Sequence, residues 1–268
     1  RIGRNYGGYA NSVAILFEAP GGQTMAEGAR AGYLGYLAVV EWAAENADRL
    51  RRTVRDARIA TLEAARSGGE VAVQQEYEAE EETVEYDIVV GDWRDLEEGE
   101  EPELMTVTDG LLMKSPVATA TRERPWAYLL PRDAEAAVAM LRRHGITVER
   151  LTEDAELEVQ GYTVGGISYE RAYNHAAAVR VEVGEVVTRT ETFPRGTYVV
   201  STEQMLGRLV AHMLEVETDD NVVYWNTMDA WLPRPEAEAQ PDRGAFTRDR
   251  EEGPPLVPIF KLMTPRPL

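Results

Sequence analysis

The alternation of apolar and polar positions predicts a strand followed by a long helix at the start of the chain. Residues 12–18 form a continuous apolar run that ends in Glu18, which is typical of a buried strand covered on both faces. A Pro-Gly-Gly turn follows, and Thr24 with Glu27 three residues later has the pattern of a helix capping box. Helical spacing of apolar residues then continues, with a cap or uninterrupted helix at 46–48, until glycines stop it at 68–69.

Beyond residue 69 the pattern changes to strands with one clear helix. Short strands are predicted at 71–73 and 84–90, separated by an acidic stretch at 76–82, and a second acidic run at 95–103 is predicted to be a loop. A strand at 126–130, a helix and a strand at 146–151 form one strand–helix–strand unit. Asp133 is predicted to cap this helix, with Ala137, Val138 and Leu141 facing inward. His144-Gly145 closes it, and Gly145 suits the left-handed position after a helix end.

The last third predicts further strands and a second helix. Residues 154–193 alternate as strands do, 196–201 form another strand, and 203–214 carry apolar residues at helical spacing. The stretch rich in Pro, Glu and Arg at about 233–253 predicts a loose linker, after which 254–260 are apolar enough to pack. The pattern therefore predicts an α/β chain that is rich in strands after its first long helix.

Composition removes several classes of function. The 268 residues include 28 Lys and Arg against 47 Asp and Glu, a net charge of −19, with no cysteine and three widely spaced histidines. Disulfides, thiolate metal sites and compact histidine motifs are thereby excluded, and an acidic surface disfavours nucleic acid. No apolar run approaches the roughly 20 residues that span a bilayer. The start at Arg1 has no signal-peptide pattern and reads as the middle of a longer protein.

Glu18 is the strongest candidate for chemistry. A carboxylate at the end of a buried strand lies where open α/β sheets place a ligand, and burial would raise its pKa for proton transfer. The alternative is a structural glutamate that pairs with an arginine or begins the turn.

Residues 4–19, Arg-Asn-Tyr-Gly-Gly-Tyr-Ala-Asn-Ser-Val-Ala-Ile-Leu-Phe-Glu-Ala, resemble the closing catalytic segment of zinc carboxypeptidases of the carboxypeptidase A type, in their bacterial branch. The helix expected at 24–66 matches the long helix that follows in that family. Patches at 126–131, 144–148, 194–200 and 223–229 are similar to the C-terminal extension of bacterial members. The implied fold is the end of a carboxypeptidase-like mixed sheet with its long helix over 1–68, followed by a mixed α/β, strand-rich appendage over 69–268.

The resemblance implies a hydrolase in which Glu18 is the general base on zinc-bound water. It further implies that Tyr6 or Tyr9 hydrogen-bonds the substrate and that Arg4 faces a substrate carboxylate. In the family the zinc is held by a His-x-x-Glu pair and a later His upstream of the catalytic Glu, and this chain has no histidine before His144. Zinc is therefore expected in the full-length protein, with no metal ligand in this chain.

The expected substrate is a peptide or cell-wall peptide, and the expected location is extracellular or periplasmic. A missing N-terminal catalytic region would be the intramolecular partner. The competing hypothesis is a non-catalytic accessory module or pseudoenzyme that supports a protease domain. Simpler interpretations suffice for other features: His144 as a helix C-cap, His212 as a packed or surface residue, and the acidic runs as solvated faces rather than calcium loops.

Overall fold

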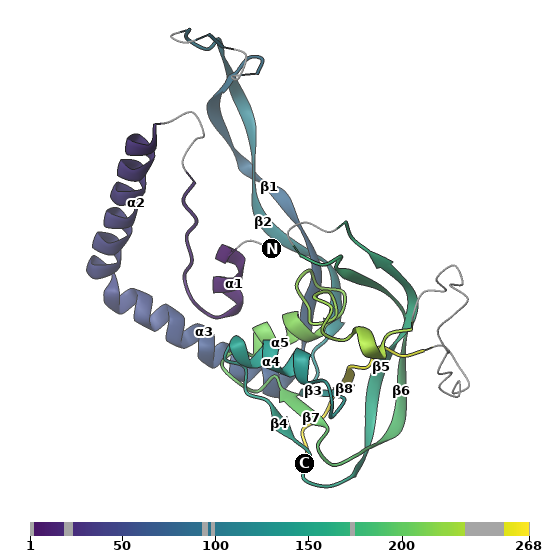
Figure 1. The fold of residues 1–268 in the computed structure, drawn as a ribbon. Coiled ribbons are helices and arrows are strands. Elements are labelled where there is room, and N and C mark those ends of the chain that lie inside the picture. Colours follow the sequence, from purple (N-terminus) through teal and green to yellow (C-terminus); the bar gives the residue numbers. More distant parts are fainter. Residues whose placement is uncertain are drawn as a thin grey trace, which may run out of the picture. The chain divides into compact units, whose positions relative to one another are not determined.

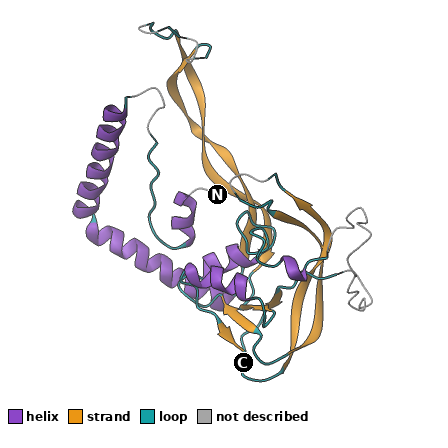
Figure 2. Cartoon of the chain, viewed as in Figure 1, coloured by secondary structure: helices purple, strands orange, loops and turns teal. Residues whose placement is uncertain are grey.

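The computed structural model describes residues 3–18, 24–92, 96–97, 100–171, 175–233 and 255–267. Its described part is a mixed α/β fold with two antiparallel sheets, which confirms the predicted strand-rich α/β class (Figures 1 and 2). The chain divides into two compact units, one formed by residues 1–71 and 123–268 and the other by residues 72–122. The domain boundary predicted at 68/69 is a different division and stays a prediction.

The first unit begins with three helices. Helix α1 spans Gly3–Tyr9, α2 spans Met25–Glu45 and α3 spans Ala47–Ser67. The predicted capping box is present, because Thr24 Oγ1 accepts a hydrogen bond from the Glu27 amide while the Glu27 carboxylate accepts one from the Thr24 amide. Asn46 separates α2 from α3, and Gly68, with φ of 76°, ends α3 as the sequence predicts.

The same unit contains a six-stranded sheet. Its strands are β3 (Ala127–Leu130), β4 (Glu149–Arg150), β5 (Ala155–Tyr169), β6 (Val179–Phe193), β7 (Tyr198–Ser201) and β8 (Phe260–Leu262). Their order is β4-β7-β3-β8-β5-β6, so the last strand in sequence lies inside the sheet between β3 and β5.

Alternate residues of the short central strands enter two separate hydrophobic clusters. Tyr128 and Leu130 of β3 pack with helices α4 (Glu135–Arg143) and α5 (Gly207–Leu214), whereas Ala127 and Leu129 pack with residues of β5, β7 and β8. This period-two division places one core on each face of the sheet. The predicted inward face of α4 is confirmed, because Ala137, Val138 and Leu141 are buried. The predicted cap at Asp133 is wrong, because the N-cap residue is Ala134 and no side chain caps the helix.

The second unit is a two-stranded antiparallel hairpin. Strands β1 (Glu70–Val89) and β2 (Leu104–Glu123) pair with each other, and most of their residues are exposed. Residues 72–122 contain 15 acidic residues and only three basic ones, so much of the net negative charge of the chain lies here.

Several predicted elements were wrong. Residues 76–82 do not separate two strands but form the middle of β1. Most side chains of this strand are exposed, so its acidic residues carry no desolvation cost. The predicted strand at 146–151 is limited to Glu149–Arg150, and the helix predicted at 203–214 begins at Gly207. The predicted linker at 233–253 lies, except for Pro233, outside the described residues.

The buried strand predicted at 12–18 is also absent. These residues are extended, but they join neither sheet and all seven are exposed. A strand needs a hydrogen-bonding neighbour, and the described part of the chain places none beside this segment. The residues just before it, Gly3–Tyr9, form helix α1.

Candidate functional site

The candidate site comprises α1 and the extended segment that leads to Glu18. Glu18 is exposed, so the burial predicted for it at the end of a strand is wrong. Val13, Ile15, Leu16 and Phe17 are also exposed, by 43–59 % of their surfaces. Glu18 therefore ends an apolar segment whose side chains face solvent.

Close approach at a glycine fixes the direction in which this segment leaves α1. The Ser12 amide and hydroxyl both donate to the carbonyl oxygen of Gly7, at 2.8 and 3.0 Å. A Cβ atom on Gly7 would lie 2.4 Å from the Cβ atom of Ala14. Glycine at position 7 thus permits the extended segment to fold back against the helix.

Asn11 anchors the turn between α1 and the segment. Its backbone is in the left-handed region with φ of 52°, a conformation in which Asn is enriched, and the residue is 5 % exposed. Asn11 Nδ2 donates to the carbonyl oxygen of Met205 at 2.7 Å, and the Thr61 hydroxyl donates to Asn11 Oδ1 at 3.3 Å. The turn is therefore tied to α3 and to the chain just before α5.

The two tyrosines proposed from the resemblance each contact a histidine. The Tyr6 hydroxyl and His144 Nδ1 are hydrogen-bonded at 3.2 Å, and their ring centroids lie 5.3 Å apart. Tyr9 stacks on His212, with centroids 4.1 Å apart and ring planes at 21°. The structure thus brings two of the three histidines to α1, a pairing that sequence reasoning missed because each partner lies more than 130 residues away.

Burial lowers the pKa of both histidines. For His144 the second cause is the neighbouring Arg143, and for His212 the nearby carboxylates of Asp220 and Asp219 act in the opposite direction. The lowered pKa values favour the neutral form of both histidine rings at neutral pH. A neutral ring suits the stacking of His212 on Tyr9 and the hydrogen bond between His144 and Tyr6. The side chain of Arg4, the remaining predicted substrate contact, lies outside the described residues.

A second cluster of ionisable groups is buried in the core of the sheet. Lys261 Nζ lies 2.8 Å from Glu215 Oε1, and the hydroxyls of Tyr128 and Tyr162 donate to the two oxygens of Glu215, each at 2.7 Å. All four side chains are at most 3 % exposed, and Lys261 also donates to the Tyr162 hydroxyl at 3.0 Å. Burial, together with the Glu215 carboxylate, raises the pKa of Tyr128 well above its usual range.

This buried network has the character of a structural element rather than of a reaction site. Each charge has an opposite charge and further hydrogen bonds, which is the condition for tolerating ions in a core. Its members come from β3, β5, β8 and the end of α5, so the network joins the final strand to the rest of the sheet.

The described residues do not fit a zinc ion. Among them, no group of three or more histidine, aspartate or glutamate side chains is placed to hold a metal. His144 and His212 are engaged with tyrosines, and His175 Nδ1 lies 2.6 Å from the carbonyl oxygen of Ala176. Within the same ranges, no helix is both long and apolar enough to cross a membrane.

Comparison with known proteins gives a partial match to carboxypeptidases. The chain is 27 % identical over 126 residues to a probable carboxypeptidase 2 of Arthroderma benhamiae, covering 44 % of this chain and 24 % of that protein. It is 26 % identical over 127 residues to carboxypeptidase 2 of Trichophyton tonsurans, with the same coverage of both chains. The match thus spans about a quarter of the length of these curated relatives.

No protein-family model matches the chain, and no solved structure gives a significant match. Over somewhat less than half of its residues, the chain is similar to fungal carboxypeptidases.

Proposed function

We propose that this chain is the C-terminal portion of a zinc-dependent carboxypeptidase of the carboxypeptidase A type, in its bacterial branch, with Glu18 as the general base. The observation that carries the proposal is the partial similarity to carboxypeptidases, taken with the resemblance of residues 4–19 to the closing catalytic segment. The capped helix that begins directly after this segment agrees with the same order of elements.

Glu18 would transfer protons during hydrolysis of a C-terminal peptide bond. An exposed carboxylate at the end of an extended segment is free to take a proton from the attacking water and then give it to the leaving amine. In this proposal the zinc ligands lie upstream of this chain, because the family's His-x-x-Glu pair and later His precede the catalytic glutamate and no histidine precedes His144 here.

The tyrosines of α1 would contribute to substrate contact in different ways. Tyr6 keeps 41 % of its surface exposed while its hydroxyl contacts His144, so its ring edge is accessible to a peptide. Tyr9 is half-buried against His212 and is better placed to hold α1. Arg4 in the same helix would face a substrate carboxylate, since the guanidinium fork matches a carboxylate bidentately. The substrate would be a peptide or cell-wall peptide met outside the cytoplasm.

The test uses the intact protein that contains this chain and a short peptide with a free C-terminus. We expect Glu18→Gln to reduce hydrolysis by about 10²- to 10⁴-fold, the contribution typical of a general base. Zinc content, measured by metal analysis, should be unchanged because Glu18 is not a ligand in the proposal.

The matched control is Glu41→Gln, the same chemical change at an exposed position in α2. Its hydrolysis rate should equal that of the wild type. If Glu18→Gln remained active, the catalytic assignment would be wrong.

A non-catalytic role for residues 69–268 is the second candidate. The observation that favours it is that this part contains both hydrophobic clusters and a fully paired buried network, and thus a complete core. An intact protein that hydrolyses no peptide, yet whose stability is unaffected by Glu18→Gln, would favour this accessory role over the enzyme.

A further inference from the structure

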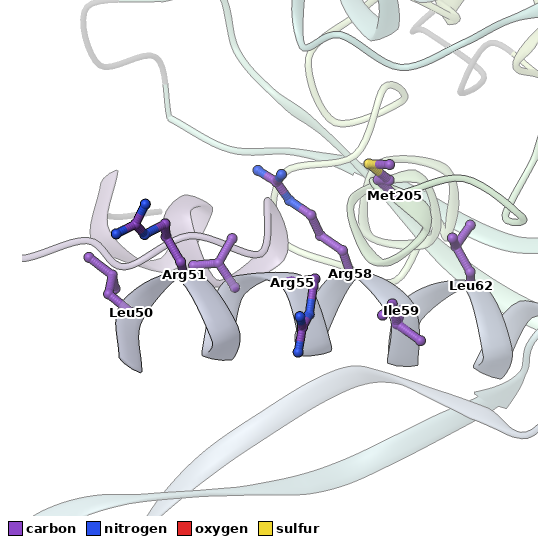
Figure 3. Close-up of a pocket in the computed structure, with 8 residues that line it drawn as sticks. Leu50, Arg51, Arg55, Arg58, Ile59, Leu62 and Met205 are labelled. Atoms are coloured by element: carbon purple, nitrogen blue, oxygen red, sulfur yellow. The ribbon is translucent and has the colours of Figure 1, made fainter. Parts of the chain in front are cut away.

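Helix α3 carries a groove whose lining includes neither Glu18 nor any residue of the two hydrophobic clusters. It has a volume of about 390 Å³, within the usual range for ligand sites in proteins. Its apolar surface comes from Leu50, Val54, Ile59 and Leu62 of α3 and from Met205 just before α5 (Figure 3). All of these residues belong to the first compact unit.

Two apolar side chains of the lining have about half of their surface exposed and can contact a ligand. Ile59 is 46 % exposed and Met205 is 56 % exposed, although both are large apolar side chains. Leu50, Val54 and Leu62, at other positions along the groove, are half-buried. Removing such apolar surface from water is favourable, so an apolar side chain laid over Ile59 and Met205 would be stabilised.

Three guanidinium groups line the same groove. Arg51 and Arg55 are four residues apart on one row of the helix, and Arg58 lies three residues beyond Arg55. In Figure 3 the Arg58 side chain leaves α3 on the side where Met205 lies and extends back toward Arg51, whereas Arg55 points to the opposite side. Arginine forks bind carboxylates bidentately, and such charge-assisted pairs are stronger than neutral hydrogen bonds.

These arginines are available for a new carboxylate. Arg51 pairs with Asp48 and Arg55 with Asp56, each at 2.9 Å, but all four side chains are at least 61 % exposed, so the pairs are weak and exchangeable. For Arg58, no ion pair or hydrogen bond is found with any residue in the described ranges.

Helix α3 has a net positive charge, whereas the chain as a whole is negatively charged. The helix carries six arginines and three acidic residues, whereas the whole chain has a net charge of −19. A long polyanion such as nucleic acid would be repelled by the molecule as a whole, and a simple inorganic anion would leave the apolar lining uncovered. A short segment with alternating carboxylates and apolar side chains satisfies both parts of the groove.

We propose that the α3 groove, lined by Leu50, Val54, Ile59, Leu62, Met205 and the three arginines, is a docking site for an acidic amphipathic segment of a partner protein. The apolar side chains of the segment would cover Ile59 and Met205 while its carboxylates pair with Arg58 and displace the exposed Asp48 and Asp56 pairs. This interaction is independent of the catalytic assignment of Glu18.

The test measures binding of a fluorescein-labelled peptide of alternating Glu and Leu to the complete chain by fluorescence anisotropy at low salt. We expect saturable binding that Arg58→Glu weakens by at least about tenfold, the equivalent of one lost charge-assisted contact. Arg58→Lys should retain part of the affinity, and Ile59→Ser should weaken binding without changing the net charge.

The matched control is Arg52→Glu, which makes the same charge change at an exposed position of α3 outside the groove. Affinity should be close to that of the wild type. Equal weakening by Arg52→Glu and Arg58→Glu would show general charge attraction and overturn the proposal.

Two further outcomes would also overturn it. One is the absence of saturable binding to the folded wild-type chain, with folding checked by circular dichroism. The other is a dimer in sedimentation experiments that Arg58→Glu dissociates and the peptide does not, because the groove would then be filled by a second copy.

Discussion

Tyr9 stacks on His212 with ring centroids 4.1 Å apart, which joins the first helix of the chain to helix α5 across about 200 residues of sequence. Together with the hydrogen bond between Tyr6 and His144, this contact places both tyrosines of α1 on histidine rings. The position of the segment that ends in Glu18 therefore depends on residues far along the chain.

The contact between Tyr9 and His212 should make stability depend on pH. Burial lowers the His212 pKa below its ordinary value of 6.5, so the unfolded chain binds the proton first as pH falls. The contribution of the neutral ring is complete above pH 6.5 and is lost as pH falls toward the lower folded-state pKa. Urea unfolding of wild type and His212→Gln at several pH values should show that the free energy of unfolding depends less on pH in the variant. An equal pH dependence in the two proteins would contradict this role of His212.

Removing the lysine of the buried network should be costly. Lys261→Met leaves the Glu215 carboxylate buried beside two tyrosine hydroxyls without its opposite charge, and we expect a loss of about 3–5 kcal/mol in the free energy of unfolding. Lys261→Met combined with Glu215→Leu should recover much of this loss. Lys114→Met, at an exposed position, is the control and should be nearly neutral in denaturant titrations. A neutral Lys261→Met would contradict the role given to the pair.

Asn11 should tolerate glycine better than a β-branched residue. Asn11→Gly removes the hydrogen bonds to Met205 and Thr61 but keeps an unstrained backbone at φ of 52°. Asn11→Val removes the same bonds and adds left-handed strain of roughly 1–2 kcal/mol. Thermal unfolding should therefore rank wild type above Asn11→Gly and Asn11→Gly above Asn11→Val; a reversed order of the two variants would exclude backbone strain as the reason for Asn.

The close approach between Gly7 and Ala14 can be tested by exchanging the two residues. Gly7→Ala places a methyl group 2.4 Å from the Ala14 Cβ atom and should displace the segment at 12–18. We expect faster cleavage of this segment in limited proteolysis. The double variant Gly7→Ala with Ala14→Gly removes the clash and should restore wild-type resistance, while failure to do so would show that the methyl contact is not the cause.

The sequence pattern correctly predicted those features that depend only on residues close together in the sequence. The capping box at Thr24, the glycine stop after α3, the buried face of α4 and the positive φ of Gly145 all depend on residues within one or two turns of each other. The apolar run at 12–18 predicted a buried strand because burial usually follows such a run, but a strand also requires a neighbour that local sequence cannot supply.

The candidate site was predicted only in part. Glu18 was singled out from its place at the end of a predicted strand and from a resemblance, and Tyr6 and Tyr9 from the resemblance alone. Their catalytic and substrate roles stay predictions. The histidine contacts of α1, the anchoring by Asn11 and the pair of Glu215 with Lys261 join residues from distant parts of the sequence. Periodicity carries no signal for such contacts, although Asn11 could have been suspected from the preference of Asn for left-handed backbone.

The place of β8 inside the sheet has a consequence for biosynthesis. Strands β3 and β5 are made long before residues Phe260–Leu262, which lie between them and bring Lys261 to Glu215. As a nascent chain leaves the ribosome, one half of the sheet, β4-β7-β3, cannot join the other half, β5-β6, until its last strand emerges. Glu215 also has no opposite charge until Lys261 has been synthesised. Cooperative folding of the six-stranded sheet is therefore expected only after translation of residue 262.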